Sequence, residues 1–156
     1  MPQLPQEIWR RRVESEYLQL RQKGYDFDVS ADHTQYLFRI KGDALCRKAG
    51  AIVPIFSHEV SLTITRDYPY AGGFVLVWRT PIFHPNIDEK GKVCIRLVNL
   101  WAAGQTISNI VDALAQLLQN PNPDSPLNYE AAQYYIENPR PQPSAAPRLS
   151  RPKIVG

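Results

Sequence analysis

The chain has little cysteine and no long apolar run. Its two cysteines, Cys46 and Cys94, are 48 residues apart and lack the paired Cys or His spacing of a structural zinc site. The longest apolar stretch, residues 49–56, is broken by Gly50 and Pro54 and is too short to span a bilayer. The first residues show no basic start followed by an apolar core, so no signal peptide is expected. We therefore expect a cytoplasmic protein without a metal site, a membrane span or a disulfide.

Acidic residues are missing from the last part of the chain, residues 139–156. The basic residues of this segment are Arg140, Arg148, Arg151 and Lys153. Without them the chain has 14 basic and 15 acidic residues, so the net charge of +3 comes from this segment. No nucleic-acid binding is therefore expected of the domain. The segment is also rich in Pro and Ser, which predicts a flexible tail after a domain of residues 1–138.

An amphipathic helix is expected over residues 5–23. Its apolar positions recur at helical spacing: Trp9, Val13, Tyr17 and Leu20. Pro5 suits the first turn and Gly24 suits the C-terminal stop. A basic run lies on the other side of this helix: Arg10, Arg11 and Arg12. The run is either a solvated face or a docking surface for an acidic partner.

The middle of the chain shows strand patterns. Four runs alternate or are rich in β-branched and aromatic residues: 25–30, 35–41, 57–66 and 73–79. Short connections between them favour an antiparallel meander. The periodicity fades over residues 80–104, and a long irregular segment in a compact domain usually carries function. Helices are expected over 106–119 and 128–138, which together predict an α+β fold.

The irregular segment holds the candidate chemistry. A His-Pro-Asn triplet occupies residues 84–86, and Cys94 follows Asn86 by eight residues. Cys94 lies outside any amphipathic pattern, so it is not placed as a core residue. A turn around residues 90–91 allows the chain to fold back and bring the Asn86 amide near the thiol, where an N–H is a suitable oxyanion donor. From composition alone, a lone thiol is more often a small buried hydrophobe.

This segment resembles the His-Pro-Asn motif and active-site cysteine of ubiquitin-conjugating enzymes, with the family's Asn-to-Cys spacing. His84, Pro85 and Asn86 match the motif. Further matches follow in chain order: Asp67-Tyr68-Pro69-Tyr70, Trp101, Pro121-Asn122-Pro123-Asp124-Ser125-Pro126-Leu127-Asn128, Glu130-Ala131-Ala132 and Tyr135. The resemblance covers roughly residues 5–137. It implies the ubiquitin-conjugating-enzyme fold: an N-terminal helix, a four-stranded antiparallel meander, an active-site stretch and then further helices.

The resemblance also implies a reaction. Cys94 would accept ubiquitin or a ubiquitin-like modifier as a thioester from an activating enzyme and pass it to a substrate lysine. The thioester stores the activation, so no cofactor is expected. Asn86 is either the oxyanion donor of the lysine step or a residue that holds the loop. Asp124 and Ser125 are expected near the incoming lysine, where polar groups orient the amine and help it lose a proton.

The remaining expectations concern shape and partners. His84, Pro85 and Asn122 are expected to shape the active site. Tyr70, Ala102 and Ala103 are expected to contact a ligase of the RING type, since an exposed aromatic is a plausible interface anchor; burial of Tyr70 is the alternative. The resemblance further implies that the activating enzyme contacts Arg10, Arg11 and Arg12.

The chain departs from the family's pattern at several points. Ala71-Gly72-Gly73 stands where the family has two prolines, residues 42–56 form a long segment without the usual turn, and Ala102-Ala103-Gly104 replaces a common Ser-Pro-Ala. These departures favour a divergent archaeal or bacterial member. Two other classes compete with an active enzyme: a non-catalytic ubiquitin-binding adaptor of the same fold, which would typically lack the cysteine, and a Cys/His hydrolase, whose signature is missing around Cys94.

Overall fold

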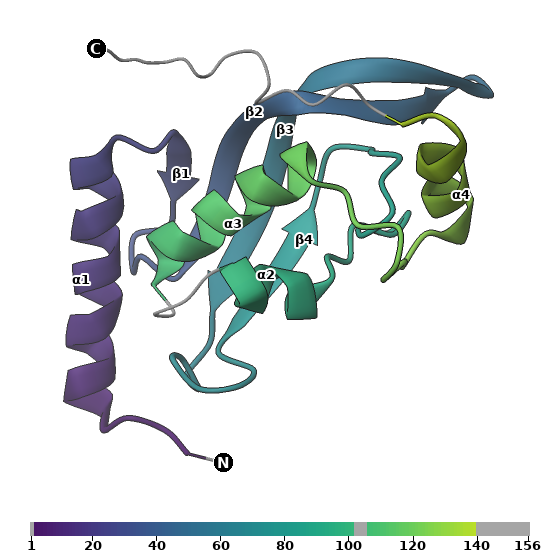
Figure 1. Cartoon of the computed structure of the whole chain (residues 1–156). Coiled ribbons are helices and arrows are strands. Elements are labelled where there is room, and N and C mark those ends of the chain that lie inside the picture. Colours follow the sequence, from purple (N-terminus) through teal and green to yellow (C-terminus); the bar gives the residue numbers. More distant parts are fainter. Residues whose placement is uncertain (1, 102–105, 140–156) are drawn as a thin grey trace, which may run out of the picture.

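The computed structural model describes residues 2–101 and 106–139. Helix α1 (Gln6–Lys23) comes first, followed by the strands β1 (Phe27–Val29), β2 (Gln35–Lys48), β3 (Ala51–Ile64) and β4 (Phe74–Trp78). Three helices complete the order: α2 (Ile95–Trp101), α3 (Ile107–Gln119) and α4 (Tyr129–Glu137). This arrangement, drawn in Figure 1, confirms the α+β fold with one helix before a four-stranded sheet and further helices after it.

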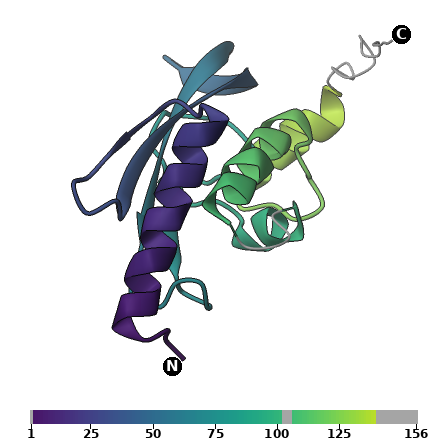
Figure 2. The same ribbon diagram turned by 90° about the vertical axis from the view of Figure 1, so that its left-hand side faces the viewer.

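The strands form one antiparallel sheet in the order β1-β2-β3-β4. All three pairings join strands that follow one another in the chain, so the sheet is a meander. Helices α2, α3 and α4 lie on the same side of the sheet, and α1 stands beyond its β1 end (Figure 2). Among the described residues, no helix covers the opposite face of the sheet.

The predicted strands were too short over residues 42–56. β2 and β3 continue as a paired ladder to Lys48 and Ala51, after a register shift between Lys41 and Ala44. Ala49 and Gly50 connect them with φ values of 52° and 80°. Positive φ at both connecting residues is typical of the two-residue hairpin turn that matches the strand twist. The segment that looks like a long connection in the sequence is a hairpin.

The core lies between the sheet and the helices. α3 contributes most to it: Ile110, Leu114 and Leu117 are fully buried on its inner face. Each such side chain stabilises the fold by about 1.5–3 kcal/mol relative to an exposed position. Thr106 caps α3 by accepting a hydrogen bond from the Asn109 N–H.

Residues 80–104 are less irregular than predicted, because α2 occupies residues 95–101. A helix of seven residues has too few turns to show a period in the sequence. No helix within residues 2–101 and 106–139 has the length and apolar character that crossing a membrane requires. The predicted tail, from residue 140 onward, and the ligase-contact residues Ala102 and Ala103 lie outside the described residues.

Candidate active site

Cys94 lies directly before α2 and is half-buried. Its N–H donates to the Asn86 carbonyl at 2.9 Å, and its own carbonyl accepts from the Val98 N–H at 3.2 Å. An antiparallel bridge between Ile87 and Val93 holds the two sides of the preceding turn together. The chain therefore folds back between Asn86 and Cys94, as the spacing predicts.

The turn before Cys94 depends on Asp88 and Gly91. The Asp88 carboxylate accepts from the N–H groups of Lys90 at 2.9 Å and Lys92 at 2.8 Å. Gly91 has φ 90°, a left-handed conformation that favours glycine. The Gly91 carbonyl accepts from the Trp78 N–H at 2.8 Å, so this turn is attached to the end of β4.

Replacing Gly91 by alanine is expected to lower the free energy of unfolding by about 2–3 kcal/mol. A Cβ at this position would lie 2.3 Å from the Trp78 carbonyl oxygen, and the φ value is unfavourable as well. Urea denaturation followed by tryptophan fluorescence measures the loss. Gly50→Ala is the matched control, because Gly50 has φ 80° but nothing within 4 Å of an added Cβ. Equal losses in the two variants would contradict the steric argument.

The His84 ring is fully buried and shapes the turn. Its Nδ1 accepts from the Asn86 N–H at 3.0 Å, so Nδ1 carries no proton. The other nitrogen, Nε2, therefore donates to the Leu117 carbonyl, 2.9 Å away on α3. With both nitrogens bonded in the interior, the ring links the motif to α3 instead of acting as a base. Pro85 also holds structure, because its carbonyl accepts from the N–H groups of Leu127 and Asn128.

The Asn86 side chain is fully buried and fixes the loop of residues 121–128. Its Nδ2 donates to the carbonyls of Asn122 at 2.8 Å and Ser125 at 3.0 Å. Its Oδ1 accepts from the Asn122 N–H at 2.8 Å. A side-chain amide has two N–H donors, and both are used here. This geometry favours the alternative in which Asn86 holds the loop.

The loop of residues 121–128 carries the remaining predicted polar residues. Asn122 Oδ1 accepts from the Asp124 N–H at 2.9 Å, which is an Asx turn. Asp124 is exposed, and Ser125 Oγ accepts a hydrogen bond from Arg96 Nη2 at 2.5 Å. Arg96 was not among the predicted site residues. Its place two residues after Cys94 was the available signal, but a charged residue on a short helix shows no partner in the sequence.

Comparisons with known proteins identify the family. The family model described as ubiquitin-conjugating enzyme matches residues 13–147. The chain belongs to the ubiquitin-conjugating enzyme family. Ubiquitin-conjugating enzyme E2-20 kDa of Schizosaccharomyces pombe is 32% identical over 82 residues, which are 52% of this chain and 46% of that protein. The chain therefore aligns with about half the length of that relative. The E2 domain of a Toxoplasma gondii ubiquitin conjugating enzyme superposes with a TM-score of 0.64, at 25% identity, over 82% of this chain and 86% of that one.

Tyr70 of this ubiquitin-conjugating enzyme homologue lies on the surface, with 43% of its area exposed. It lines a hollow of about 480 Å³ with the segment around Ala71 and Gly72 and with two residues of α2, Ile95 and Asn99. Ile95 is itself 40% exposed, so two apolar side chains from different elements border the hollow. Of the alternatives for Tyr70, exposure is therefore the one that the structure supports.

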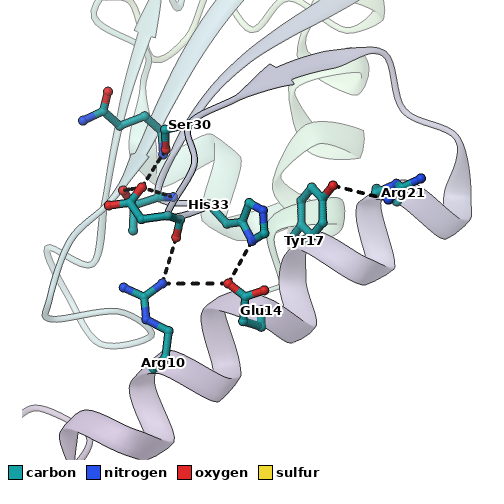
Figure 3. A network of polar contacts seen from close by, with 9 residues as sticks. Arg10, Glu14, Tyr17, Arg21, Ser30 and His33 are labelled. Atoms are coloured by element: carbon teal, nitrogen blue, oxygen red, sulfur yellow. Dashed lines mark hydrogen bonds and ion pairs between the residues drawn. The ribbon is translucent and has the colours of Figure 1, made fainter.

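The basic run on α1 is not uniform. Arg10 donates to the Asp32 carbonyl at 2.8 Å and lies 3.9 Å from Glu14, within the contacts drawn in Figure 3. Arg12 donates to Glu16 at 3.0 Å. Arg11 is exposed. Two of the three arginines thus bind within the chain, which leaves Arg11 the best placed of them to meet a partner.

The same network attaches the turn between β1 and β2 to α1. His33, whose φ is 62°, stacks on Tyr17 with ring centroids 3.7 Å apart, and its Nδ1 lies 2.8 Å from Glu14 (Figure 3). Bonds from Ser30 and Thr34 to the Asp32 carboxylate lower the pKa of that group to about 2. These contacts join the side of α1 that carries Arg10, Glu14 and Tyr17 to the turn between β1 and β2.

The second thiol lies in a different setting. Cys46 is buried on β2, 8% exposed, and both cysteines are free thiols. Among the described residues, no three His, Cys, Asp or Glu side chains come together as metal ligands. Of the two thiols, Cys94 is therefore the more accessible.

Proposed function

We propose that this family member carries ubiquitin or a ubiquitin-like modifier as a thioester on Cys94 and transfers it to a lysine of a protein substrate. The observation that supports this most is the position of Cys94. Its side chain is half-buried, and its backbone N–H donates to the Asn86 carbonyl. The Asn86 side chain in turn holds the loop of residues 121–128. The motif thus joins the thiol and the loop in one fixed unit, as nucleophilic catalysis requires.

Loading is a thiol–thioester exchange that moves the modifier's acyl group from one cysteine to another. The Cys94 thiolate attacks the carbonyl carbon of a modifier held on the activating enzyme's cysteine, a new C–S bond forms, and that cysteine leaves as a thiolate. In the second step an amine attacks the new thioester. In this proposal His84, Pro85, Asn86 and Asn122 hold the site, and Asp124 and Ser125 lie on the approach of the lysine. The folded chain positions the reacting groups, and the free energy of thioester cleavage drives the transfer to the amine.

The proposal extends to partners. A RING-type ligase would use the hollow bordered by Tyr70 and Ile95, because exposed apolar side chains around a hollow are typical of interface anchors. The predicted contacts Ala102 and Ala103 belong to the same proposal. The activating enzyme would meet α1, with Arg11 as the available cation. We propose a cytoplasmic location for these reactions.

The test is a loading assay with the wild-type chain. The protein is incubated with ubiquitin, a ubiquitin-activating enzyme and ATP, and the products are separated without reducing agent. A band that carries ubiquitin, disappears on addition of thiol and maps to Cys94 by mass spectrometry is the expected result. The same assay repeated with ubiquitin-like modifiers and their activating enzymes identifies the modifier. Binding of ubiquitin without any adduct would favour the adaptor alternative.

A further inference from the structure

Arg96 carries a positive charge close to Cys94 in the sequence. It lies two residues after Cys94, on the first turn of α2, and is exposed. Its Nη2 donates to Ser125 Oγ, and no ion pair joins it to an acid within residues 2–101 and 106–139. A guanidinium has five N–H donors in a rigid plane, so donors remain after the bond to Ser125.

A closed ring of contacts links this guanidinium to the backbone of Cys94. The Cys94 N–H donates to the Asn86 carbonyl, and Asn86 Nδ2 donates to the Ser125 carbonyl. Ser125 Oγ accepts from Arg96, and the backbone leads from Arg96 back to Cys94 in two residues. Each link is a hydrogen bond or a short step along the chain. The guanidinium therefore bridges α2 and the loop of residues 121–128, and belongs to the same hydrogen-bonded unit as the backbone of Cys94.

The attack of an amine on a thioester requires a donor for the carbonyl oxygen. Asn86 was the candidate from the sequence, but both hydrogens of its fully buried amide are donated to loop carbonyls. Turning the hydrogen that is bonded to Ser125 toward the thioester would take that donor from the Ser125 carbonyl, and such a loss typically costs about 1–3 kcal/mol. Arg96 supplies a donor without that cost, and its charge also suits an oxyanion.

We propose, on the basis of the function proposed above, that Arg96 stabilises the oxyanion formed when the amine attacks the Cys94 thioester. The amine lone pair forms a C–N bond, and the C=O π pair moves to oxygen, which accepts hydrogen bonds from the guanidinium. The pair then returns as the C–S bond breaks, Cys94 leaves as a thiolate, and the nitrogen gives its proton to solvent. Ser125 is a positioning residue that holds the guanidinium in place.

The experiment separates loading from discharge. Ubiquitin bearing a C-terminal mercaptoethanesulfonate thioester is used to load Cys94 by thiol exchange, so no activating enzyme has to be matched. After removal of excess reagent, the adduct is discharged with hydroxylamine or free lysine and followed on non-reducing gels. Arg96→Ala is expected to reach the same final extent of loading, when loading is run to completion, and to discharge about 10- to 50-fold more slowly. This is less than the ~10²–10³-fold cost of a buried oxyanion donor, because Arg96 is exposed to solvent.

Three further variants test whether the effect comes from the guanidinium of Arg96 and from its position. Arg96→Lys keeps the charge without the planar fork and should recover part of the rate. Ser125→Ala retains the guanidinium of Arg96 but removes the hydroxyl to which it is bonded. This variant should slow discharge by less than Arg96→Ala. Arg79→Ala is the matched control, because Arg79 is also exposed and also donates to a serine, Ser61, but lines a separate hollow on the sheet. It should discharge at the wild-type rate.

The dependence on pH distinguishes the oxyanion role from an effect on the lysine. An oxyanion donor lowers the barrier by the same factor at every pH and with hydroxylamine, which is neutral near pH 7. Recovery of the wild-type rate by Arg96→Ala at high pH would show that Arg96 acts by lowering the pKa of the amine, and would overturn the inference. Normal discharge of a loaded Arg96→Ala would overturn it too. A wild-type chain that forms no adduct by either loading route would overturn the proposed function itself.

Discussion

Cys94→Ala is expected to abolish the thiol-sensitive adduct, with a loss of more than about 10³-fold in the loading rate. The modifier's carboxyl must form a bond to Sγ, and alanine offers no nucleophile. Half-burial gives the Cys94 side chain access to a partner, while its backbone N–H and carbonyl are fixed by Asn86 and Val98. Loading is measured on non-reducing gels with ubiquitin, a ubiquitin-activating enzyme and ATP.

Cys94→Ser tests the chemistry of the bond. A hydroxyl is a weaker nucleophile than a thiol, so we expect slow loading to an oxygen ester. That adduct should persist in thiol and be cleaved by hydroxylamine, whereas the wild-type adduct is lost in both. An adduct of Cys94→Ser that thiol removes would mean that the modifier sits on another residue.

Cys46→Ala is the matched control for the nucleophile. Cys46 is the chain's other cysteine, and it is buried on β2 at 8% exposure. A buried structural thiol is inert, so this variant should load at the wild-type rate if it folds. Persistence of the adduct in Cys94→Ala together with its loss in Cys46→Ala would reverse the assignment of the nucleophile.

The helices that carry local signals could be predicted from the sequence. α1 ends where Gly24 takes a φ of 77°, α3 begins at the Thr106 cap, and α4 begins after Asn128, whose side chain accepts from the Ala131 N–H. Caps and periodicity depend on residues a few positions apart, so they are visible in a sequence. The fold-back between Asn86 and Cys94 is equally local.

What the sequence did not reveal depends on contacts between distant segments. The two alternatives for Asn86 stayed open because its partners, Asn122 and Ser125, are 36 and 39 residues away. A role for Arg96 can be inferred only from the folded chain, in which the loop of residues 121–128 brings Ser125 within hydrogen-bonding distance of it. The extended hairpin was missed because Gly42 and Pro54 interrupt the alternation that predicts a strand.

The buried face of α1 also could not be fully predicted from the sequence, because it depends on contacts with distant residues. The sequence predicts an apolar stripe that includes Tyr17, but the buried residue at this turn is Glu16, 3% exposed. Tyr17 is only partly buried and stacks on His33. A carboxylate is rarely buried without partners, and the partners of Glu16 lie up to 91 residues away in the chain.

The Glu16 carboxylate joins three parts of the fold. Its Oε2 accepts from Arg12 Nε at 3.0 Å and from the Tyr68 hydroxyl at 2.5 Å, and its Oε1 accepts from the Ile107 N–H at 2.9 Å. Burial, followed by the bond to Glu16, raises the pKa of Tyr68 well above its usual range, so the hydroxyl remains a donor. One side chain thus holds α1, the segment before Tyr70 and the start of α3.

Glu16→Ala is therefore expected to lower the free energy of unfolding by about 3–5 kcal/mol, the typical cost of removing one partner from a buried charged pair. The substitution removes an acceptor from three donors at once. Urea denaturation followed by the fluorescence of Trp9 and Trp78 measures the loss. Glu14→Ala is the matched control on the same helix. Its carboxylate is 44% exposed and pairs with Arg10 and His33, so the loss should stay within about 1 kcal/mol.

A double-mutant cycle isolates the bond between Glu16 and Tyr68. Glu16→Gln keeps the shape and an acceptor oxygen for the Ile107 N–H, and Tyr68→Phe removes only the hydroxyl. If the two groups interact as the geometry indicates, the losses should be non-additive by about 1–2 kcal/mol. Additive losses would show that Glu16 acts through Arg12 and Ile107 alone. A Glu16→Ala variant as stable as Glu14→Ala would mean that this carboxylate does not hold the three elements together.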